Sequence, residues 1–160
     1  MTALMIVYDY CSGISLKELG FRRDTLKGSL LFNTIASVVL IVPMFLAFRA
    51  GFIRSPTVPS WELFFTYYIF ISSPSQEFLF RSNLFAMMRR NNIKGPLLQV
   101  VMSAFTFSFL HIFYGDTLTL LATFSIGLLW GWIYYKYPNF LGVTLSHALV
   151  GAAAIKMGLI

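Results

Sequence analysis

Charged residues are scarce in this chain: they make up 11% of its 160 residues, whereas a soluble domain carries about 25%. Hydrophobic residues make up 58%, and the mean hydropathy is +0.74. A single water-soluble core cannot hide that much apolar surface. The composition therefore excludes an ordinary soluble protein and predicts an integral membrane protein, with room for four to six spans at about 20 residues each.

Several other features are missing. The chain has one cysteine, Cys11, so an intramolecular disulfide is excluded. No internal repeat is visible, and no His-Glu-x-x-His spacing typical of zinc peptidases occurs. The net charge of +6 does not indicate nucleic-acid binding, because the cationic stretches are short and border apolar segments. We therefore expect a lipid bilayer as surroundings and no nucleic acid as partner.

Five apolar segments predict the fold. They are residues 29–48, 61–88, 96–113, 117–135 and 139–159. Residues 1–11 are apolar but too short to span, so we expect them to lie in the interface or re-enter it. In the second segment Ser72-Ser73-Pro74-Ser75 predicts a kink or restart, because proline removes a backbone donor. The predicted fold is all-α: a polytopic transmembrane bundle of about five spans plus the N-terminal segment, in one membrane domain covering 1–160.

The basic residues predict the orientation of the bundle. Cytoplasmic segments of membrane proteins carry an excess of lysine and arginine. If the N-terminus is inside, the cytoplasmic segments hold eight lysines and arginines and the outer loops hold two. The eight are Lys17, Arg22, Arg23, Lys27, Arg89, Arg90, Lys94 and Lys136, and the two are Arg49 and Arg54. We expect the N-terminus inside, the C-terminus outside, and a prokaryotic cytoplasmic (inner) membrane as location.

Four ionisable side chains lie deep within the predicted spans: Glu77, Arg81, His111 and His147. A charge in hydrocarbon costs several kcal/mol, so such groups mark ion pairs, wet cavities or chemistry. Glu77 and Arg81 are four residues apart and share one helix face, which predicts an ion pair that clamps the kinked helix. At 1.5 Å per residue, Glu77 lies roughly 20 Å, His111 roughly 22 Å and His147 roughly 12 Å from the cytoplasmic end of its own span. These depths agree within about two helical turns, so the three side chains are expected to converge.

Other interpretations of these side chains are also consistent with the sequence. A lone intramembrane histidine commonly hydrogen-bonds a neighbouring helix. Glu77, His111 and His147 are also a conceivable set of two histidines and one carboxylate for zinc. Gly127 and Gly131 predict close packing between two helices.

The ordered motifs resemble the CPBP family, the CAAX-protease and bacteriocin-processing intramembrane glutamic endopeptidases. That family has Glu-Glu-x-x-x-Arg, then Phe-x-x-x-His, then a histidine followed four residues on by Asn or Asp. The matching segments, within a motif-bearing core of about 61–151, are Gln76-Glu77-Phe78-Leu79-Phe80-Arg81, Phe107-x-x-x-His111, the glycine-rich helix Gly127 to Tyr134, and His147-x-x-x-Gly151.

The resemblance implies a metal-free and cofactor-free mechanism. The first glutamate of the pair, with a histidine, activates a water that attacks a peptide carbonyl of a membrane-anchored peptide or protein. It implies catalytic roles for position 76, Glu77, His111 and His147, with Arg81 as support. A carboxylate in a low-dielectric pocket has a raised pKa and is a competent base near neutral pH.

Two positions depart from the family pattern. Gly151 stands where the family has Asn or Asp, and Gln76 stands where it has the first glutamate. A glutamine amide can hydrogen-bond a water but cannot accept its proton. Three explanations stay open: an engineered, nearly isosteric substitution; a natural non-catalytic relative that binds a membrane peptide or partner, as an immunity or chaperone factor; or Glu77 acting as the base, released from Arg81. The sequence does not predict the oligomeric state.

Overall fold

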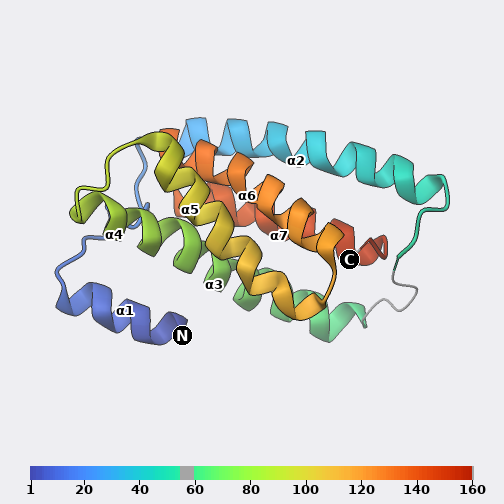
Figure 1. Ribbon diagram of the computed structural model, residues 1–160, viewed down its shortest axis with the longest axis horizontal. Helices are drawn as coiled ribbons and strands as arrows, with labels where there is room; N and C mark the ends of the chain where they lie inside the picture. Colours follow the sequence, from blue (N-terminus) through green and yellow to red (C-terminus); the bar gives the residue numbers. More distant parts are fainter. Residues whose placement is uncertain (55–59, 160) are drawn as a thin grey trace.

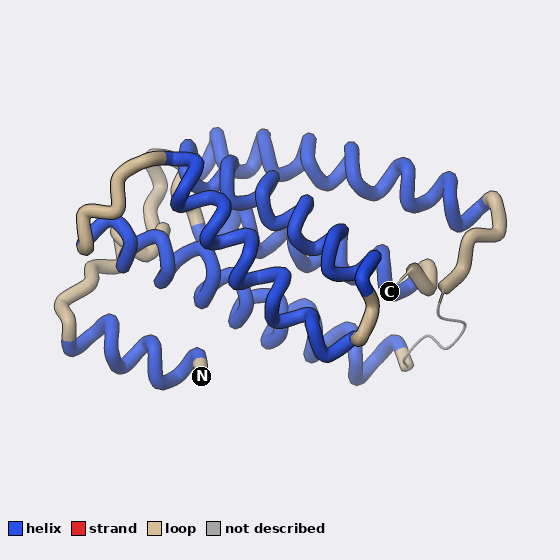
Figure 2. Tube along the Cα trace, in the orientation of Figure 1, coloured by secondary structure: helices blue, strands red, loops and turns tan. Residues whose placement is uncertain are grey.

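The computed structural model describes residues 1–54 and 60–159, apart from the side chain of Leu63. All secondary structure in these residues is helical. Figure 1 shows a short N-terminal helix beside a bundle of long helices, and Figure 2 shows no strand in the described residues. The long helices and their bounds are α2 (Leu26–Arg49), α5 (Pro96–Phe109), α6 (Thr117–Lys136) and α7 (Phe140–Lys156). The prediction of an all-α bundle is confirmed.

Residues 61–90 form one irregular helical stretch with alternating π and α turns. Its parts are η1 (Trp61–Phe65), η2 (Tyr68–Ser72), α3 (Ser73–Glu77), η3 (Phe78–Asn83) and α4 (Leu84–Arg90). Pro74 lies in the first turn of α3, and no loop interrupts the chain there. Proline lacks an N–H donor, and the turn before it has π spacing, with the N–H of Ser73 donating to the carbonyl of Tyr68. The predicted restart is thus a change of hydrogen-bond pattern at Ser73.

Glycines bring α5 and α6 together. A Cβ added at Gly127 would lie 3.0 Å from the Cα of Ala104, and one at Gly131 would lie 3.3 Å from the side chain of Val100. The predicted close packing at this pair is confirmed. On the other side of the bundle α2 packs on α7, where the hydroxyls of Ser37 and Ser146 are 2.8 Å apart.

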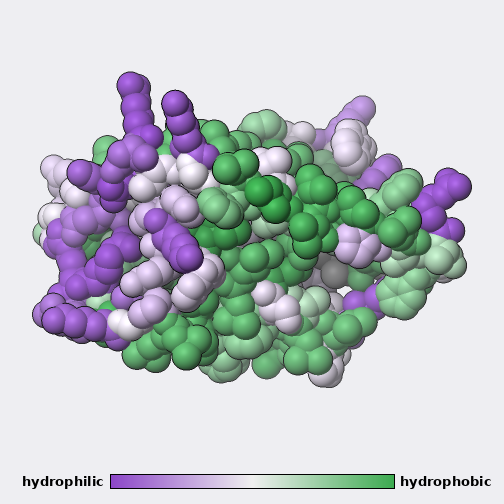
Figure 3. Space-filling view, turned by 90° about the horizontal axis from the view of Figure 1, so that it is seen from above, coloured by the Kyte–Doolittle hydropathy of each residue, from purple (hydrophilic) through white to green (hydrophobic). Residues whose placement is uncertain are grey.

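Three polar segments meet at one end of the bundle. Thr25, just before α2, donates to the carbonyl of Pro138 at 2.7 Å, and Asn139, at the start of α7, donates to the carbonyl of Arg22 at 2.6 Å. Arg89 of α4 donates to the carbonyl of Glu18 at 2.8 Å. Figure 3 shows hydrophilic residues gathered at this end and hydrophobic ones over the middle. We call this the basic end.

The opposite end is closed by Arg54, which pairs with Asp116 at 2.5 Å and donates to the carbonyl of Leu159 at 3.1 Å. Three helical segments between the two ends are long and apolar enough to cross a membrane: Leu26–Arg49, Pro96–Tyr114 and Thr117–Lys136. The helix α7 is apolar but shorter. The count of five spans and the N-inside orientation remain predictions.

The N-terminal helix α1 (Thr2–Cys11) lies along the flank of the bundle (Figure 1). Asn83 of η3 donates to Asp9 of α1 at 2.6 Å, and Asp9 is buried. Most other side chains of α1, such as Leu4 and Tyr10, are exposed. This placement beside the bundle agrees with a helix too short to span, and the choice between an interfacial and a re-entrant position stays a prediction.

Candidate active site

A buried cluster of three ionisable side chains lies where the irregular stretch packs on α7. Oε1 of Glu77 accepts from Nη1 of Arg81 at 3.1 Å and from Nδ1 of His147 at 2.6 Å. The side chains of Glu77 and Arg81 are 0% exposed, and that of His147 is 4% exposed. The predicted ion pair of Glu77 with Arg81 is present. The structure also brings Glu77 and His147 together, as their estimated depths suggested.

Aromatic rings enclose this cluster. The guanidinium carbon of Arg81 lies 4.3 Å from the ring centroid of Phe107 and 5.7 Å from that of Trp130, distances at which a cation and an aromatic face attract each other. Trp130 stacks on His147 at 4.8 Å and donates its indole N–H to Ser146 at 2.9 Å. The imidazole of His147 is thus held by a carboxylate at its edge and an indole on its face.

His111 does not join the ion-pair cluster. It lies in a 3-10 turn, η4 (Leu110–Tyr114), where its Nδ1 is 2.9 Å from the carbonyl oxygen of Phe107. A carbonyl can only accept, so Nδ1 carries the proton. Among the described residues no hydrogen bond joins His111 to Gln76 or Glu77. The ring of Phe107 contacts both imidazoles, at 4.9 Å from His111 and 5.5 Å from His147.

Gln76 lies beside the cluster and is half-buried. Its amide nitrogen donates to the hydroxyl of Ser72 at 3.0 Å, one turn earlier. Its Oε1 is buried, and within the described part of the chain it has no hydrogen-bond partner; the same holds for Oε2 of Glu77 and the hydroxyl of Ser73. Buried polar atoms are nearly always hydrogen-bonded. Three orphaned oxygens on one short helix therefore mark a place for a polar ligand, such as water or a peptide group.

Tyr68 was not predicted as part of the site. A Cβ added at Gly151 would clash with the hydroxyl of Tyr68, so the phenol fills the space above that glycine, one turn after His147. The rings of Tyr68 and His147 meet edge to face at 6.0 Å. The only signal in the sequence was the glycine itself, which stands where the CPBP pattern has a polar side chain.

The zinc reading of Glu77, His111 and His147 is not favoured by the geometry. Within residues 1–54 and 60–159, no three histidine, cysteine, aspartate or glutamate side chains are grouped so that they could hold a metal. Only Glu77 and His147 are in contact, and the Nδ1 of His147 is engaged by that carboxylate.

Comparisons with known proteins bear on this arrangement. Neither the search of curated proteins nor that of solved structures returned a match. A family model described as "Type II CAAX prenyl endopeptidase Rce1-like" matches residues 58–153. The matched range contains Gln76, Glu77, Arg81 and both histidines, and it extends from the start of the irregular stretch nearly to the end of α7. This chain belongs to the Rce1-like family of type II CAAX prenyl endopeptidases, which are membrane proteases.

Proposed function

We propose that this chain has the site of an intramembrane glutamic-type endopeptidase, which binds a membrane-anchored peptide and hydrolyses it when position 76 carries a carboxylate. The observation that carries the proposal is the buried Glu77–Arg81–His147 cluster next to a side chain whose oxygen lacks a partner among the described residues. As it stands, with Gln76, we expect the chain to bind the peptide and to hydrolyse it slowly at most.

Position 76 is the natural place for the base. A glutamate there would keep the contact with Ser72, because the hydroxyl that now accepts from the amide could donate to a carboxylate. The carboxylate would take a proton from water while the hydroxide oxygen bonds to the peptide carbonyl carbon. The same proton would then pass to the leaving amine as the C–N bond breaks. A positioned base contributes about 10²- to 10⁴-fold to the rate.

Glu77 is better suited to holding His147 than to accepting a proton from water. Its Oε1 accepts from both Arg81 and His147, and protonation of the carboxylate, at the unpartnered Oε2 as well as at Oε1, would remove the negative charge that holds both contacts. An ionised carboxylate can only accept, which places the imidazole proton on Nδ1 and turns Nε2 towards other partners. We infer that Glu77 and Arg81 position His147, as the sequence suggested for Arg81.

Tyr68 supplies a donor where the family's Asn or Asp is missing. Its hydroxyl lies above Gly151, one helical turn from His147. A phenolic O–H can donate to the negative oxygen that forms on the peptide carbonyl, and one such donor is worth about 10²- to 10³-fold in kcat. We infer that Tyr68 replaces the side chain that Gly151 lacks.

The substrate is expected to share the membrane with the enzyme. The outer surface of the helices carries exposed large apolar side chains, including Phe70, Phe105 and Leu149, so the surface around the bundle is suited to lipid. Together with the family, this supports a peptide segment anchored in the bilayer as substrate. The basic residues at the basic end support a cytoplasmic position for that end and with it the N-inside orientation.

The experiment compares Gln76→Glu with the parent chain in proteoliposomes that contain tagged membrane-anchored peptides. We expect cleavage by Gln76→Glu, and loss of that cleavage when His147→Gln is added. Absence of cleavage of every peptide by a folded Gln76→Glu protein would contradict the peptidase proposal. Peptide capture by the parent chain that is weakened by His111→Ala would then support the alternative, a purely binding role.

A further inference from the structure

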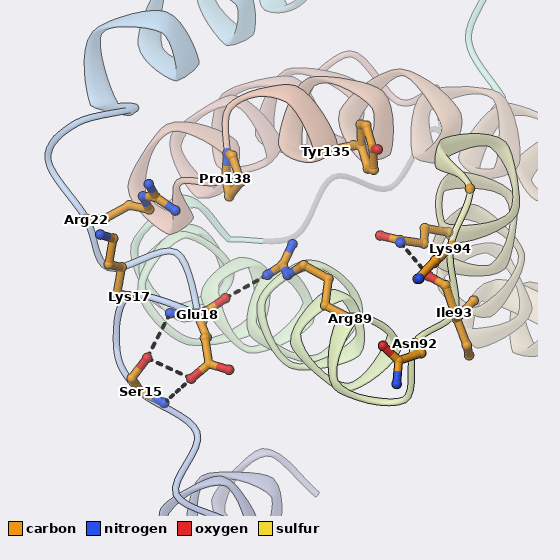
Figure 4. Close-up of a pocket in the computed structure, with 12 residues that line it drawn as sticks. Ser15, Lys17, Glu18, Arg22, Arg89, Asn92, Ile93, Lys94, Tyr135 and Pro138 are labelled. Atoms are coloured by element: carbon orange, nitrogen blue, oxygen red, sulfur yellow. Dashed lines mark hydrogen bonds between the residues drawn. The ribbon is translucent and has the colours of Figure 1, made fainter.

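A cavity with polar walls lies at the basic end, away from Glu77. Its volume is about 590 Å³, and it is lined by the 12–25 segment, the end of α4, the start of α5 and the end of α6. Figure 4 shows Arg89 across the middle of this cavity, with Lys17 and Arg22 on one side and Lys94 on the other. Four cationic side chains therefore line one space, two from the 12–25 segment and two from the end of α4 and the turn that follows it.

The positive charge of the cavity is largely uncompensated. Glu18 is the one acidic residue that lines it, and its carboxylate is occupied by Arg90, at 2.9 and 3.0 Å. The hydrogen bonds from the Arg90 guanidinium and from Ser15 lower the pKa of Glu18 to about 2. Arg22 pairs with Asp24. Within the described residues Lys17, Arg89 and Lys94 have no acidic partner, so the cavity is suited to an anion.

Gln99 adds a second kind of contact. It lines the cavity and is 5% exposed, and its amide nitrogen donates to the carbonyl of Ile93 at 2.7 Å. Its Oε1 is buried and has no partner among the described residues. This oxygen accepts hydrogen bonds and repels anions, so a ligand that fits here carries a hydroxyl or N–H donor next to its anionic group. A phosphate that carries a polyol would satisfy both the lysines and the glutamine.

The surroundings of the cavity favour a lipid over a soluble phosphate. Leu97 and Leu98, beside the cavity on the first turn of α5, are 71% and 51% exposed. Trp132 and Tyr135 stack on each other at the end of α6, with Lys136 over the indole, as in the aromatic belt at a membrane surface. Acyl chains would therefore find apolar surface beside a headgroup held in the cavity.

We propose that this cavity binds the headgroup of an anionic glycerophospholipid, with the phosphate on Arg89 and Lys94 and a headgroup hydroxyl on Gln99. The site is separate from the proposed hydrolysis and does not depend on it. One lipid bound per chain would fix the depth of the basic end in the membrane. General attraction of the basic residues to a negative membrane surface would not fix it in this way.

The test is a titration of the purified chain in neutral detergent, followed by native mass spectrometry. Phosphatidylglycerol is compared with phosphatidic acid, which lacks the glycerol hydroxyls, and with phosphatidylcholine. We expect one tightly bound phosphatidylglycerol. Arg89→Gln with Lys94→Gln should weaken it at least tenfold more than the matched pair Arg23→Gln with Lys27→Gln, since those two exposed cations lie outside the cavity.

Two further arms make the result decisive. Gln99→Met should weaken the binding of phosphatidylglycerol severalfold and leave the binding of phosphatidic acid unchanged. The ratio of the two affinities does not depend on the overall stability of the variant. Equal losses of phosphatidylglycerol affinity in the two double variants would overturn the proposal. They would show that the lipid is held by general electrostatic attraction and not by this cavity. Displacement of the lipid by soluble glycerol 3-phosphate at similar concentrations would also overturn it, by assigning the cavity to a soluble ligand.

Discussion

Removing one charge of the Glu77–Arg81 pair should destabilise the protein far more than removing both. The two side chains are fully buried and 3.1 Å apart, and loss of one partner of a buried pair costs about 3–5 kcal/mol. Arg81→Met leaves Glu77 in contact with His147, so the lower end of that range is expected. Glu77→Gln leaves Arg81 without its anion, and the ring of Phe107 at 4.3 Å offsets about 2 kcal/mol of the cost.

The double variant, Glu77→Gln with Arg81→Met, leaves no uncompensated charge from the pair. We expect it to cost less than about 3 kcal/mol, well below the two single costs added together. The assay is reversible unfolding by SDS in mixed micelles, followed by tryptophan fluorescence. The matched controls are Glu62→Gln and Arg23→Met, which change exposed residues and should stay within about 0.5 kcal/mol of the parent. Single variants that cost less than about 1 kcal/mol, or costs that simply add, would refute the reasoning.

In the Gln76→Glu background, Tyr68→Phe should lower kcat by about 100-fold with little change in KM, while the neighbouring exposed Tyr67→Phe should not; an unchanged kcat would exclude Tyr68 as a donor to the oxyanion. At the basic end, carbon-13 NMR should place the pKa of Glu18 at about 2, and Arg90→Gln should return it towards the ordinary 4.5. Because this pKa is depressed, the contact is complete above pH 4.5 and is lost as the pH falls through about 2; a midpoint that Arg90→Gln does not move would be inconsistent with the observed pairing.

Much of the fold followed from hydropathy and local spacing. Apolar length predicted the helices that became α2, α5, α6 and α7, because lipid demands long runs of internally hydrogen-bonded backbone. The four-residue spacing of Glu77 and Arg81 predicted their contact, because it is a local property of a helix. His147 was expected to converge with Glu77, and the two are in contact, although the sequence could not specify Nδ1 as the atom that meets the carboxylate.

Other features depend on tertiary packing and could not be predicted. The π turns before and after Pro74 were not predicted, because hydropathy and the position of a proline do not distinguish π from α spacing. Tyr68 carried no signal of its own in the sequence, and its place beside His147 depends on the space that Gly151 leaves for its hydroxyl. Asp9 lay in a segment expected in the membrane interface or re-entering it, and its burial against Asn83 had no signal in the sequence. His111 matched a motif, and its contact with the cluster is through Phe107.

The central claim is that the site lacks only a proton acceptor at position 76. The most direct test is the single-turnover cleavage rate of a bound membrane peptide by the parent chain and by Gln76→Glu, measured in the same proteoliposomes. The account predicts a rate 10²- to 10⁴-fold higher for the glutamate variant, with similar peptide affinity. Equal rates in two folded proteins that bind the peptide equally well would contradict it.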